Sequence, residues 1–293
     1  MADRPKLSRI EAVVNVASGG ASLQDVDRMR SLLAEYGVSS NVQAVEGAQV
    51  DERLRAALAA APDLVVVLAG DGTARAAAEL AGPDGPLIAP LPGGTMNMLP
   101  HAVYGTVPWA EALRSALDEG VEKHIGGGLI DGRSFLVAAV VGAPALWAPV
   151  REAVREGRLR LAAGRVRRAW RRAFSGRLRY SIDAGPRGKG EALAFLCPIA
   201  SRAMSDDEQT LEAAVIDPTT LAEAARIGLG ALVDDWRKDP AVSAAPCRAA
   251  RIWAAGRIPA VLDGEPAWLP SSAVVEWRPR LARLLAPAQE HGV

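Results

Sequence analysis

The stretch that decides the fold is residues 63–99, which read DLVVVLAGDGTARAAAELAGPDGPLIAPLPGGTMNML. It contains two short apolar runs, Leu64–Ala69 and Leu87–Leu91, and a glycine turn follows each of them. Continuous apolar runs rich in β-branched residues are typical of strands that are buried on both faces of a parallel sheet. The alanine-rich segment between the runs predicts a helix over 74–81, with Thr73 as its cap.

The two glycine turns predict a phosphate-binding site. Gly70 and Gly72 flank Asp71, and residues 92–95 read PGGT. Glycine lets the backbone approach a ligand closely, and open α/β sheets bind ligands beyond the carboxyl ends of their strands. Backbone N–H groups at such turns and at helix starts suit phosphate. Either turn alone is also compatible with a plain connection between strand and helix, so the prediction rests on the pair.

The first 124 residues alternate between strands and helices. Apolar runs predict strands at 11–16 and 38–45, and helical spacing predicts helices at 23–36 and 50–61. A further helix is expected after Pro108. This alternation predicts a doubly wound parallel sheet, and so an α/β nucleotide-binding domain over residues 1–124.

The pattern changes from about residue 125. Asp131-Gly132 is a two-residue hairpin signal. Short strands are expected at 178–182, 192–199, 211–216, 251–254, 259–262 and 273–277. Hairpins of this kind predict a second, mainly antiparallel β domain over residues 125–293. A helix from Asp217 to about Trp236 is expected to interrupt it.

Composition excludes several classes of protein. Lysine plus arginine equals aspartate plus glutamate at 34 each, so no global field points to nucleic acid. Cys197 and Cys247 are isolated and indicate neither a disulfide framework nor a zinc site. The charged first residues do not read as a signal peptide, and the apolar stretch 135–150 is broken by proline and glycine. We therefore expect a cytoplasmic protein.

The segment 151–179 is strongly basic, although the chain as a whole has no net charge. Residues 151–179 hold eleven arginines against two glutamates, around an apolar stripe that includes Trp170. A basic amphipathic helix with a tryptophan is suited to an anionic membrane surface, so the segment is a candidate for peripheral contact with the inner face of the membrane. An ordinary solvated helix that packs on its own domain is the alternative.

Taken in order along the chain, four motifs resemble those of the diacylglycerol kinase catalytic-domain superfamily, which includes bacterial lipid kinases and sphingosine kinases. Asn15 with Ser18-Gly19 is similar to its first phosphate loop. Residues 69–73, AGDGT, are similar to its G-G-D-G-T motif, and residues 92–97, PGGTMN, to its P-x-G-T-x-N motif. Residues 263–265, DGE, are similar to its D-G-E motif near the C-terminus.

The resemblance implies a nucleotide-binding α/β domain followed by a β-sandwich-like lipid-substrate domain, with ATP and a lipid alcohol meeting between them. It implies Mg²⁺-assisted transfer of the γ-phosphoryl group to a diacylglycerol-like or long-chain-base hydroxyl. Glu265 is the implied general base, and Asp71 supports the metal network or is the alternative base. Asp207 and Glu208 are the implied metal ligands. The implied nucleotide-binding residues are Asn15, Ser18, Gly19, Gly70, Gly72, Thr73, Gly94, Thr95 and Asn97.

Departures from the family pattern keep two other hypotheses open. Val16, Val45 and Met98 stand where relatives place other residues, which motivates a catalytically silent lipid- or nucleotide-binding protein of the same fold. A soluble-substrate kinase such as NAD kinase also uses a G-G-D-G-T turn, although PGGTMN and the late DGE fit that family poorly. The sequence leaves the oligomeric state open, and a homodimer is among the partners we consider.

Overall fold

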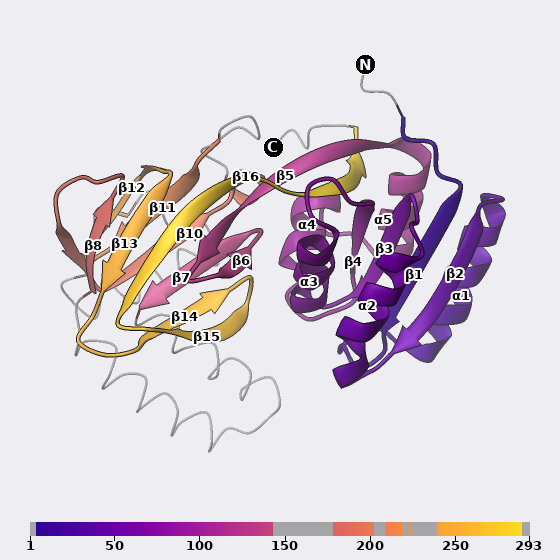
Figure 1. The fold of residues 1–293 in the computed structure, drawn as a ribbon, viewed down its shortest axis with the longest axis horizontal. Coiled ribbons are helices and arrows are strands. Elements are labelled where there is room, and N and C mark those ends of the chain that lie inside the picture. The colour runs from indigo at the N-terminus through magenta and orange to yellow at the C-terminus, as the bar shows by residue number, and fades with distance from the viewer. Residues whose placement is uncertain (1–3, 143–177, 202–208, 219–222, 224–238, 289–293) are drawn as a thin grey trace. The chain divides into compact units, whose positions relative to one another are not determined.

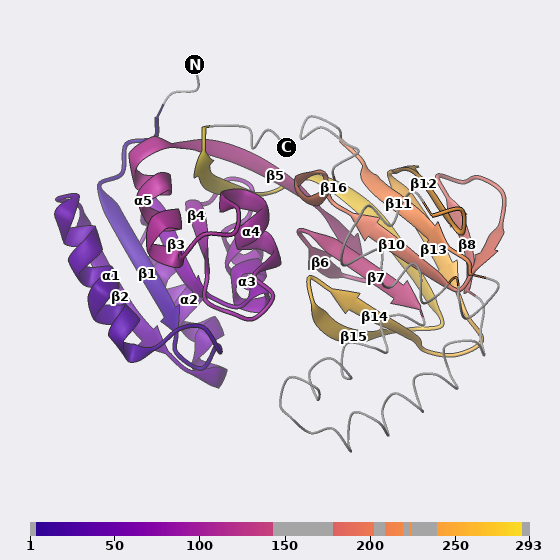
Figure 2. The same cartoon turned by 180° about the vertical axis from the view of Figure 1, so that it is seen from behind.

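The structure is a computed structural model that describes residues 4–142, 178–201, 209–218, 223 and 239–288 (Figures 1 and 2). The chain divides into two compact units. The first comprises residues 1–126 together with 279–293, and the second comprises residues 127–278. The fold is mixed α/β, with a parallel sheet in the first unit and antiparallel sheets in the second, as the sequence predicts.

The first unit alternates strands and helices. Its elements are β1 (Arg9–Asn15), α1 (Leu23–Glu35), β2 (Ser39–Val45), a 3-10 turn (Gly47–Gln49), α2 (Val50–Ala59), β3 (Leu64–Ala69), α3 (Asp71–Ala81), β4 (Leu87–Pro92), α4 (Met98–Tyr104) and α5 (Trp109–Glu119). The strands pair in the order β2-β1-β3-β4, and all these pairings are parallel. Every residue of β3 is buried, which is why Leu64–Ala69 reads as one apolar run.

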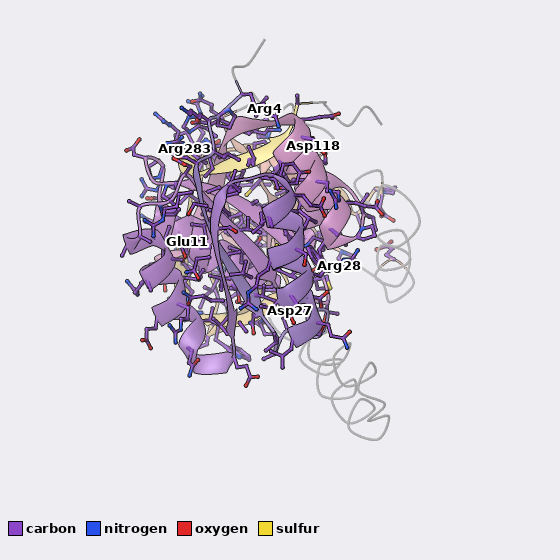
Figure 3. All side chains as sticks on the ribbon, turned by 90° about the vertical axis from the view of Figure 1, so that its right-hand side faces the viewer. Arg4, Glu11, Asp27, Arg28, Asp118 and Arg283 are labelled. Atoms are coloured by element: carbon purple, nitrogen blue, oxygen red, sulfur yellow. The ribbon has the colours of Figure 1, made fainter. Side chains whose placement is uncertain are left out.

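Helices cover both faces of this sheet. Figure 2 shows α1 and α5 on the face turned to the viewer, and α2 and α3 lie together on the opposite face. Side chains join α1 to α5: the Arg114 guanidinium pairs with the Glu35 carboxylate at 2.8 Å. Arg28, labelled in Figure 3, lies 5.2 Å from the centroid of the Trp109 ring. The predicted doubly wound arrangement is therefore confirmed.

The start of α3 differs from the prediction. Thr73 is not the cap, because the helix begins at Asp71 with Gly70 as its N-cap. The Gly70 carbonyl accepts the N–H groups of both Thr73 and Ala74, at 3.1 Å each. Thr73 thus lies inside the first turn, and its hydroxyl does not define where the helix begins.

A single carboxylate holds the amino ends of two parallel strands together. Asp63 Oδ2 accepts the N–H and the hydroxyl of Ser8 at 2.7 Å and the N–H of Arg9 at 2.8 Å. The Asp63 N–H donates to the Arg9 carbonyl at 2.9 Å, and its carbonyl accepts the Leu87 N–H at 3.0 Å. These bonds align the starts of β1, β3 and β4.

Residues 279–287 return to the first unit as the end of β16 (Ser272–Pro287), where Leu284 pairs with Ile88 of β4 in parallel. Tyr104 also donates its hydroxyl to the Leu285 carbonyl at 2.6 Å. The sequence-based division assigned all residues from 125 to 293 to the second domain. The structure differs because strand pairing, which periodicity does not reveal, places residues 279–287 beside β4.

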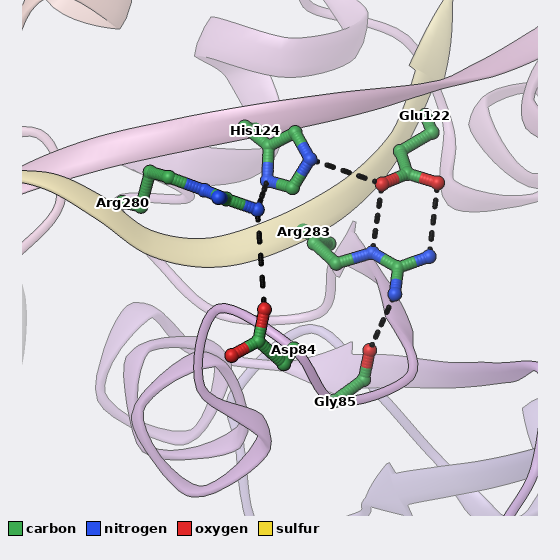
Figure 4. Close-up of polar contacts among 6 residues, drawn as sticks. All are labelled: Asp84, Gly85, Glu122, His124, Arg280 and Arg283. Atoms are coloured by element: carbon green, nitrogen blue, oxygen red, sulfur yellow. Dashed lines mark hydrogen bonds and ion pairs between the residues drawn. The ribbon is translucent and has the colours of Figure 1, made fainter.

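A polar cluster fastens the same segment (Figure 4). Arg283 forms an ion pair with Glu122 of β5 (Gly120–Ile130). Its Nε lies 2.8 Å from Glu122 Oε1, and its Nη2 donates to Glu122 Oε2 at 2.9 Å. Its Nη1 donates to the Gly85 carbonyl at 3.2 Å. His124 Nε2 lies 3.1 Å from the same Glu122 carboxylate. Arg283 therefore joins β16, β5 and the loop before β4.

The second unit is a pair of antiparallel sheets around one core. Its remaining elements are β6 (Arg133–Phe135), β7 (Ala138–Gly142), β8 (Leu178–Ile182), β9 (Gly188–Gly190), β10 (Ala192–Leu196), a 3-10 turn (Pro198–Ala200), β11 (Leu211–Ile216), β12 (Val242–Cys247), β13 (Ala249–Trp253), β14 (Ile258–Leu262) and β15 (Glu265–Leu269). One sheet has the order β12-β11-β10-β7-β14-β15, and β16, β13, β8 and β9 follow one another in the other. Phe135 and Phe195 are fully buried in the core.

Two sequence predictions fall largely outside the described residues. Of the basic segment 151–179 only Leu178 and Arg179 are described, in β8. Of the helix expected from Asp217 to Trp236, Asp217, Pro218 and Glu223 are described. Both stay predictions.

We expect Asp63→Asn to lower the free energy of unfolding by about 1 kcal/mol at neutral pH, a solvent-screened value, because the amide oxygen accepts fewer and weaker bonds. Hydrogen bonds from the Ser8 hydroxyl, the Ser8 N–H and the Arg9 N–H hold the pKa of Asp63 below its usual value of 3.8. The stabilisation is therefore complete above that value and is lost as the pH falls through the lower, folded-state pKa. Urea unfolding of both proteins across acidic pH measures the difference, and a constant difference at every pH would contradict the role of the charge.

Candidate nucleotide site

Three loops follow adjacent parallel strands of the first unit. Residues 15–20 begin with the last residue of β1, residues 70–73 follow β3 and begin α3, and residues 93–97 follow β4. Because β1, β3 and β4 are neighbours in the sheet, the three loops lie at the same edge. All nine predicted nucleotide-binding residues lie on these loops. Their role in nucleotide binding stays a prediction.

The loops touch through glycine backbones. A Cβ atom on Gly94 would lie 2.5 Å from Gly70 Cα, and one on Gly93 would lie 2.7 Å from the Ala69 nitrogen. Gly20 donates its N–H to the Gly93 carbonyl, and Gly93 donates to Ala69, both at 3.1 Å. The backbones are therefore in direct contact, and residue 94 has no space for a side chain.

Asn97 holds the third loop in shape. Its backbone is left-handed, with φ of 51°, and it is the residue before α4. The side chain turns back onto Gly94: Oδ1 accepts the Gly94 N–H at 2.8 Å, and Nδ2 donates to the Gly94 carbonyl at 3.1 Å. Asn97 stands at the N-cap position of α4, but its side chain bonds to Gly94 and does not cap that helix.

Asp71 supplies the acceptor at the start of α4. Its carboxylate Oδ1 accepts the Leu99 N–H at 3.1 Å, and the side chain is almost fully buried. Burial raises the pKa of Asp71, and bonds from the backbone of Leu99, Met98 and Asn97, with the nearby His101, act in the opposite direction. The carboxylate thus joins the second loop to the start of α4, the helix that follows the third loop, and its raised pKa favours it as a proton acceptor.

The first loop is ordered by Asn15 and Ser18. Asn15 Oδ1 accepts the Ala17 N–H at 3.1 Å, and its carbonyl accepts both the Ser18 hydroxyl at 2.6 Å and the Ser18 N–H at 3.1 Å. A Cβ atom on Gly19 would lie 3.9 Å from Thr95 Oγ1, so the first and third loops are neighbours.

Glu265 belongs to the second unit. It is exposed at the start of β15, after the two-residue turn Asp263-Gly264, whose φ angles of 46° and 85° are both left-handed. This turn is a tight hairpin between β14 and β15.

Asp263 anchors that hairpin. Its buried carboxylate accepts the Leu136 N–H at 2.7 Å and the N–H groups of Val137 and Ala138 at 2.9 Å each. Sequence reasoning identified Asp263 only as part of a motif. The position of Asp263 at a hairpin corner, directly after an apolar strand, is the sequence feature that could have indicated an anchor. The sequence does not identify its partners, because they lie about 125 residues away in the chain.

The predicted metal ligands Asp207 and Glu208 lie outside the described residues. Within the described part of the chain, no group of three or more histidine, cysteine, aspartate or glutamate side chains is arranged to hold a metal ion. No described helix combines the length and the hydropathy that crossing a bilayer requires.

Residues 9–126 match the family model of the diacylglycerol kinase catalytic domain. This match confirms the resemblance over the segment that carries the three loops, and it supports a phosphotransferase. No curated protein matches the sequence.

Two solved structures have a similar fold. A diacylglycerol kinase from Bacillus anthracis is 16% identical, with a TM-score of 0.72, and the match covers 97% of this chain and 99% of that one. Yeast NADH kinase in complex with NADH is 12% identical, with a TM-score of 0.54, and covers 97% of this chain and 84% of that one. At these identities the likeness shows a lipid-kinase-like fold and no more.

We expect Gly94→Ala to destabilise the protein by about 1–3 kcal/mol and to weaken nucleotide binding, because the added methyl group forces the second and third loops apart. Gly256→Ala is the matched control, since a Cβ atom there meets nothing within 4 Å. Thermal unfolding and calorimetric titration with ATP measure both effects. Equal stability of the two variants would contradict the close approach.

Proposed function

We propose that the protein is an ATP-dependent kinase that transfers the γ-phosphoryl group to the hydroxyl group of a diacylglycerol-like or long-chain-base lipid. The observation that carries this proposal is the direct contact of glycine backbones between the loops after β3 and β4, within the segment that matches a kinase catalytic domain. Such loops offer backbone N–H groups to phosphate with no side chain in the way.

The three loops would hold the triphosphate. Asn97 fixes the position of the Gly94 N–H, and Ser18 with Asn15 orders the first loop. In phosphoryl transfer the protein acts mainly by positioning and by charge stabilisation, so the rigidity of these turns matters more than a covalent role.

The three loops offer few carboxylates, and this is compatible with a bound Mg²⁺ ion. Magnesium is usually bound by one or two carboxylates together with substrate phosphates and water, so a site made of protein ligands alone is not required. Asp71 is the carboxylate that the described structure places at the loops, and Asp207 and Glu208 stay proposed ligands. The ion would neutralise charge on the phosphates.

Glu265 is the proposed general base. It is exposed, and the anchored Asp263-Gly264 turn fixes the backbone on which it stands. A carboxylate in this role accepts the proton of the lipid hydroxyl as the phosphoryl group is transferred. Asp71, whose pKa is raised by burial, is the alternative base.

Transfer of labelled phosphate from ATP to a bacterial lipid extract tests the proposal. We expect Glu265→Gln to lower kcat by about 10²–10⁴-fold and to leave ATP affinity unchanged, because general-base catalysis contributes to the chemical step alone. Asp71→Asn should lower both kcat and ATP affinity, because the carboxylate also holds the second loop to the start of α4, next to the third loop.

Glu276→Gln is the matched control for Glu265, because Glu276 is another glutamate of the second unit and pairs with Arg278 at 2.7 Å. Its activity should equal that of the wild type. Label transfer that survives in both Glu265→Gln and Asp71→Asn would contradict the assigned roles. Saturable binding of ATP and Mg²⁺ without turnover on any lipid would support the silent binding protein, and phosphorylation of a nicotinamide nucleotide would support the soluble-substrate kinase.

A further inference from the structure

One sheet of the second unit carries cations on its outward face. Residues directly opposite in antiparallel strands share a face of the sheet. Arg251 of β13 is opposite Val274 of β16, and Trp253 is opposite Arg179 of β8, which is in turn opposite Lys189 of β9. Figure 1 shows β16, β13 and β8 side by side.

This row points away from the core. The alternate residues of the same strands, among them Ile252, Ala273 and Val275, are buried against the second sheet. Arg179, Lys189, Arg251 and Val274 are exposed, and Val274 is one of the few large exposed apolar residues, at 38%. The face therefore combines positive charge with apolar surface.

A fourth cation lies over the tryptophan of this face. The guanidinium of Arg187, from the loop between β8 and β9, is 5.3 Å from the centroid of the half-buried Trp253 ring. We call Arg179, Arg187, Lys189 and Arg251 the cationic face.

One acidic residue shares this side of the sheet, since Glu276 lies two residues along β16 from Val274 and is opposite Ala249. Among the described residues, no carboxylate oxygen lies within 4.0 Å of any of these four cations. On the same sheet Glu276 pairs with Arg278, and Asp183 accepts the backbone N–H groups of Arg248 and Ala249. Positive charge therefore accumulates on this face of a chain whose formal net charge is zero.

We propose that the cationic face docks on the surface of an anionic lipid bilayer. Each lysine or arginine close to such a surface contributes attraction, and tryptophan and other apolar side chains pack at the level of the head groups. The choice of a lipid surface rests on the proposed function, because an enzyme that phosphorylates a lipid alcohol must reach a membrane. Of the basic segment 151–179, this face includes Arg179.

The observations favour a bilayer over nucleic acid. Proteins that bind single strands offer open aromatic rings on which bases stack. Here Arg187 already covers the ring of Trp253. A pleated sheet face with four dispersed cations matches a planar array of lipid head groups.

Co-sedimentation with vesicles tests the docking. Full-length protein is mixed with vesicles of phosphatidylcholine alone or of phosphatidylcholine with phosphatidylserine. We expect binding to the anionic vesicles only, weakened by salt. The triple variant Arg179→Glu/Lys189→Glu/Arg251→Glu should lower the partition coefficient by about a hundredfold or more, since each lost cation removes attraction.

The matched control is Lys6→Glu/Arg53→Glu/Arg55→Glu, which changes the net charge equally at exposed positions of the first unit. It should bind anionic vesicles like the wild type to within about threefold, because none of its residues belongs to the cationic face. Equal loss in both variants, no binding by the wild type, or capture of single-stranded RNA in place of vesicles would overturn the proposal. Arg251→Gln alone gives a milder change that keeps the test valid if the triple variant does not fold, with a loss of about fivefold expected.

Kinase assays in mixed detergent micelles separate this inference from the proposed function. The triple variant should phosphorylate a detergent-dispersed lipid at the wild-type rate, because none of its residues lies on the three loops or at Glu265. A wild type that binds anionic vesicles but phosphorylates no lipid would refute the kinase and leave the docking face standing. A wild type that is active in micelles but does not bind vesicles would refute the docking face alone.

Discussion

The absence of a side chain at residue 94 is the constraint on which the candidate site depends. Parallel strands β3 and β4 run side by side, and both must turn sharply at their carboxyl ends. The turns fit together only because the backbones of Gly94 and Gly70 meet directly. Asn97 then fixes Gly94 from one side, and Asp71 links the second loop to the helix that follows the third. The site is thus assembled from backbone contacts, and its polar side chains act first on the protein itself.

Two buried aspartates of the sequence motifs hold the backbone in place through hydrogen bonds. Asp71, within the motif similar to G-G-D-G-T, accepts an N–H group 28 residues further along the chain. Asp263, the first residue of the DGE motif, accepts three N–H groups of residues 136–138, whereas Glu265 in the same motif is exposed. The first position of this motif therefore maintains the hairpin, and the third is open to solvent. A resemblance between motifs does not distinguish these two roles, but burial and hydrogen bonding do.

Local signals made much of the fold predictable. Leu64–Ala69 is a strand with the predicted bounds, because an apolar run that ends at glycine needs no distant information. Strands β12 and β15 were missed, and both lie at the edges of their sheet, where one neighbour is enough and the residues of β12 are largely exposed. The return of residues 279–287 to the first sheet was also missed, because pairing with β4 leaves no trace in periodicity. At the candidate site, the sequence identified which residues share the loops, but not the contacts that join them.

The way β16 closes the first sheet has a consequence for biosynthesis. Leu284 pairs with Ile88, and Tyr104 bonds to the Leu285 carbonyl, so the first unit includes chain that the ribosome makes after the whole second unit. Domains that are continuous in sequence fold as they emerge during translation. The first unit cannot complete its folding as it emerges, because its parallel sheet keeps an open edge at β4 until β16 leaves the ribosome. The first unit is thus completed only after the second has been synthesised, and a chain cut short before residue 279 would leave the edge of β4 exposed to aggregation.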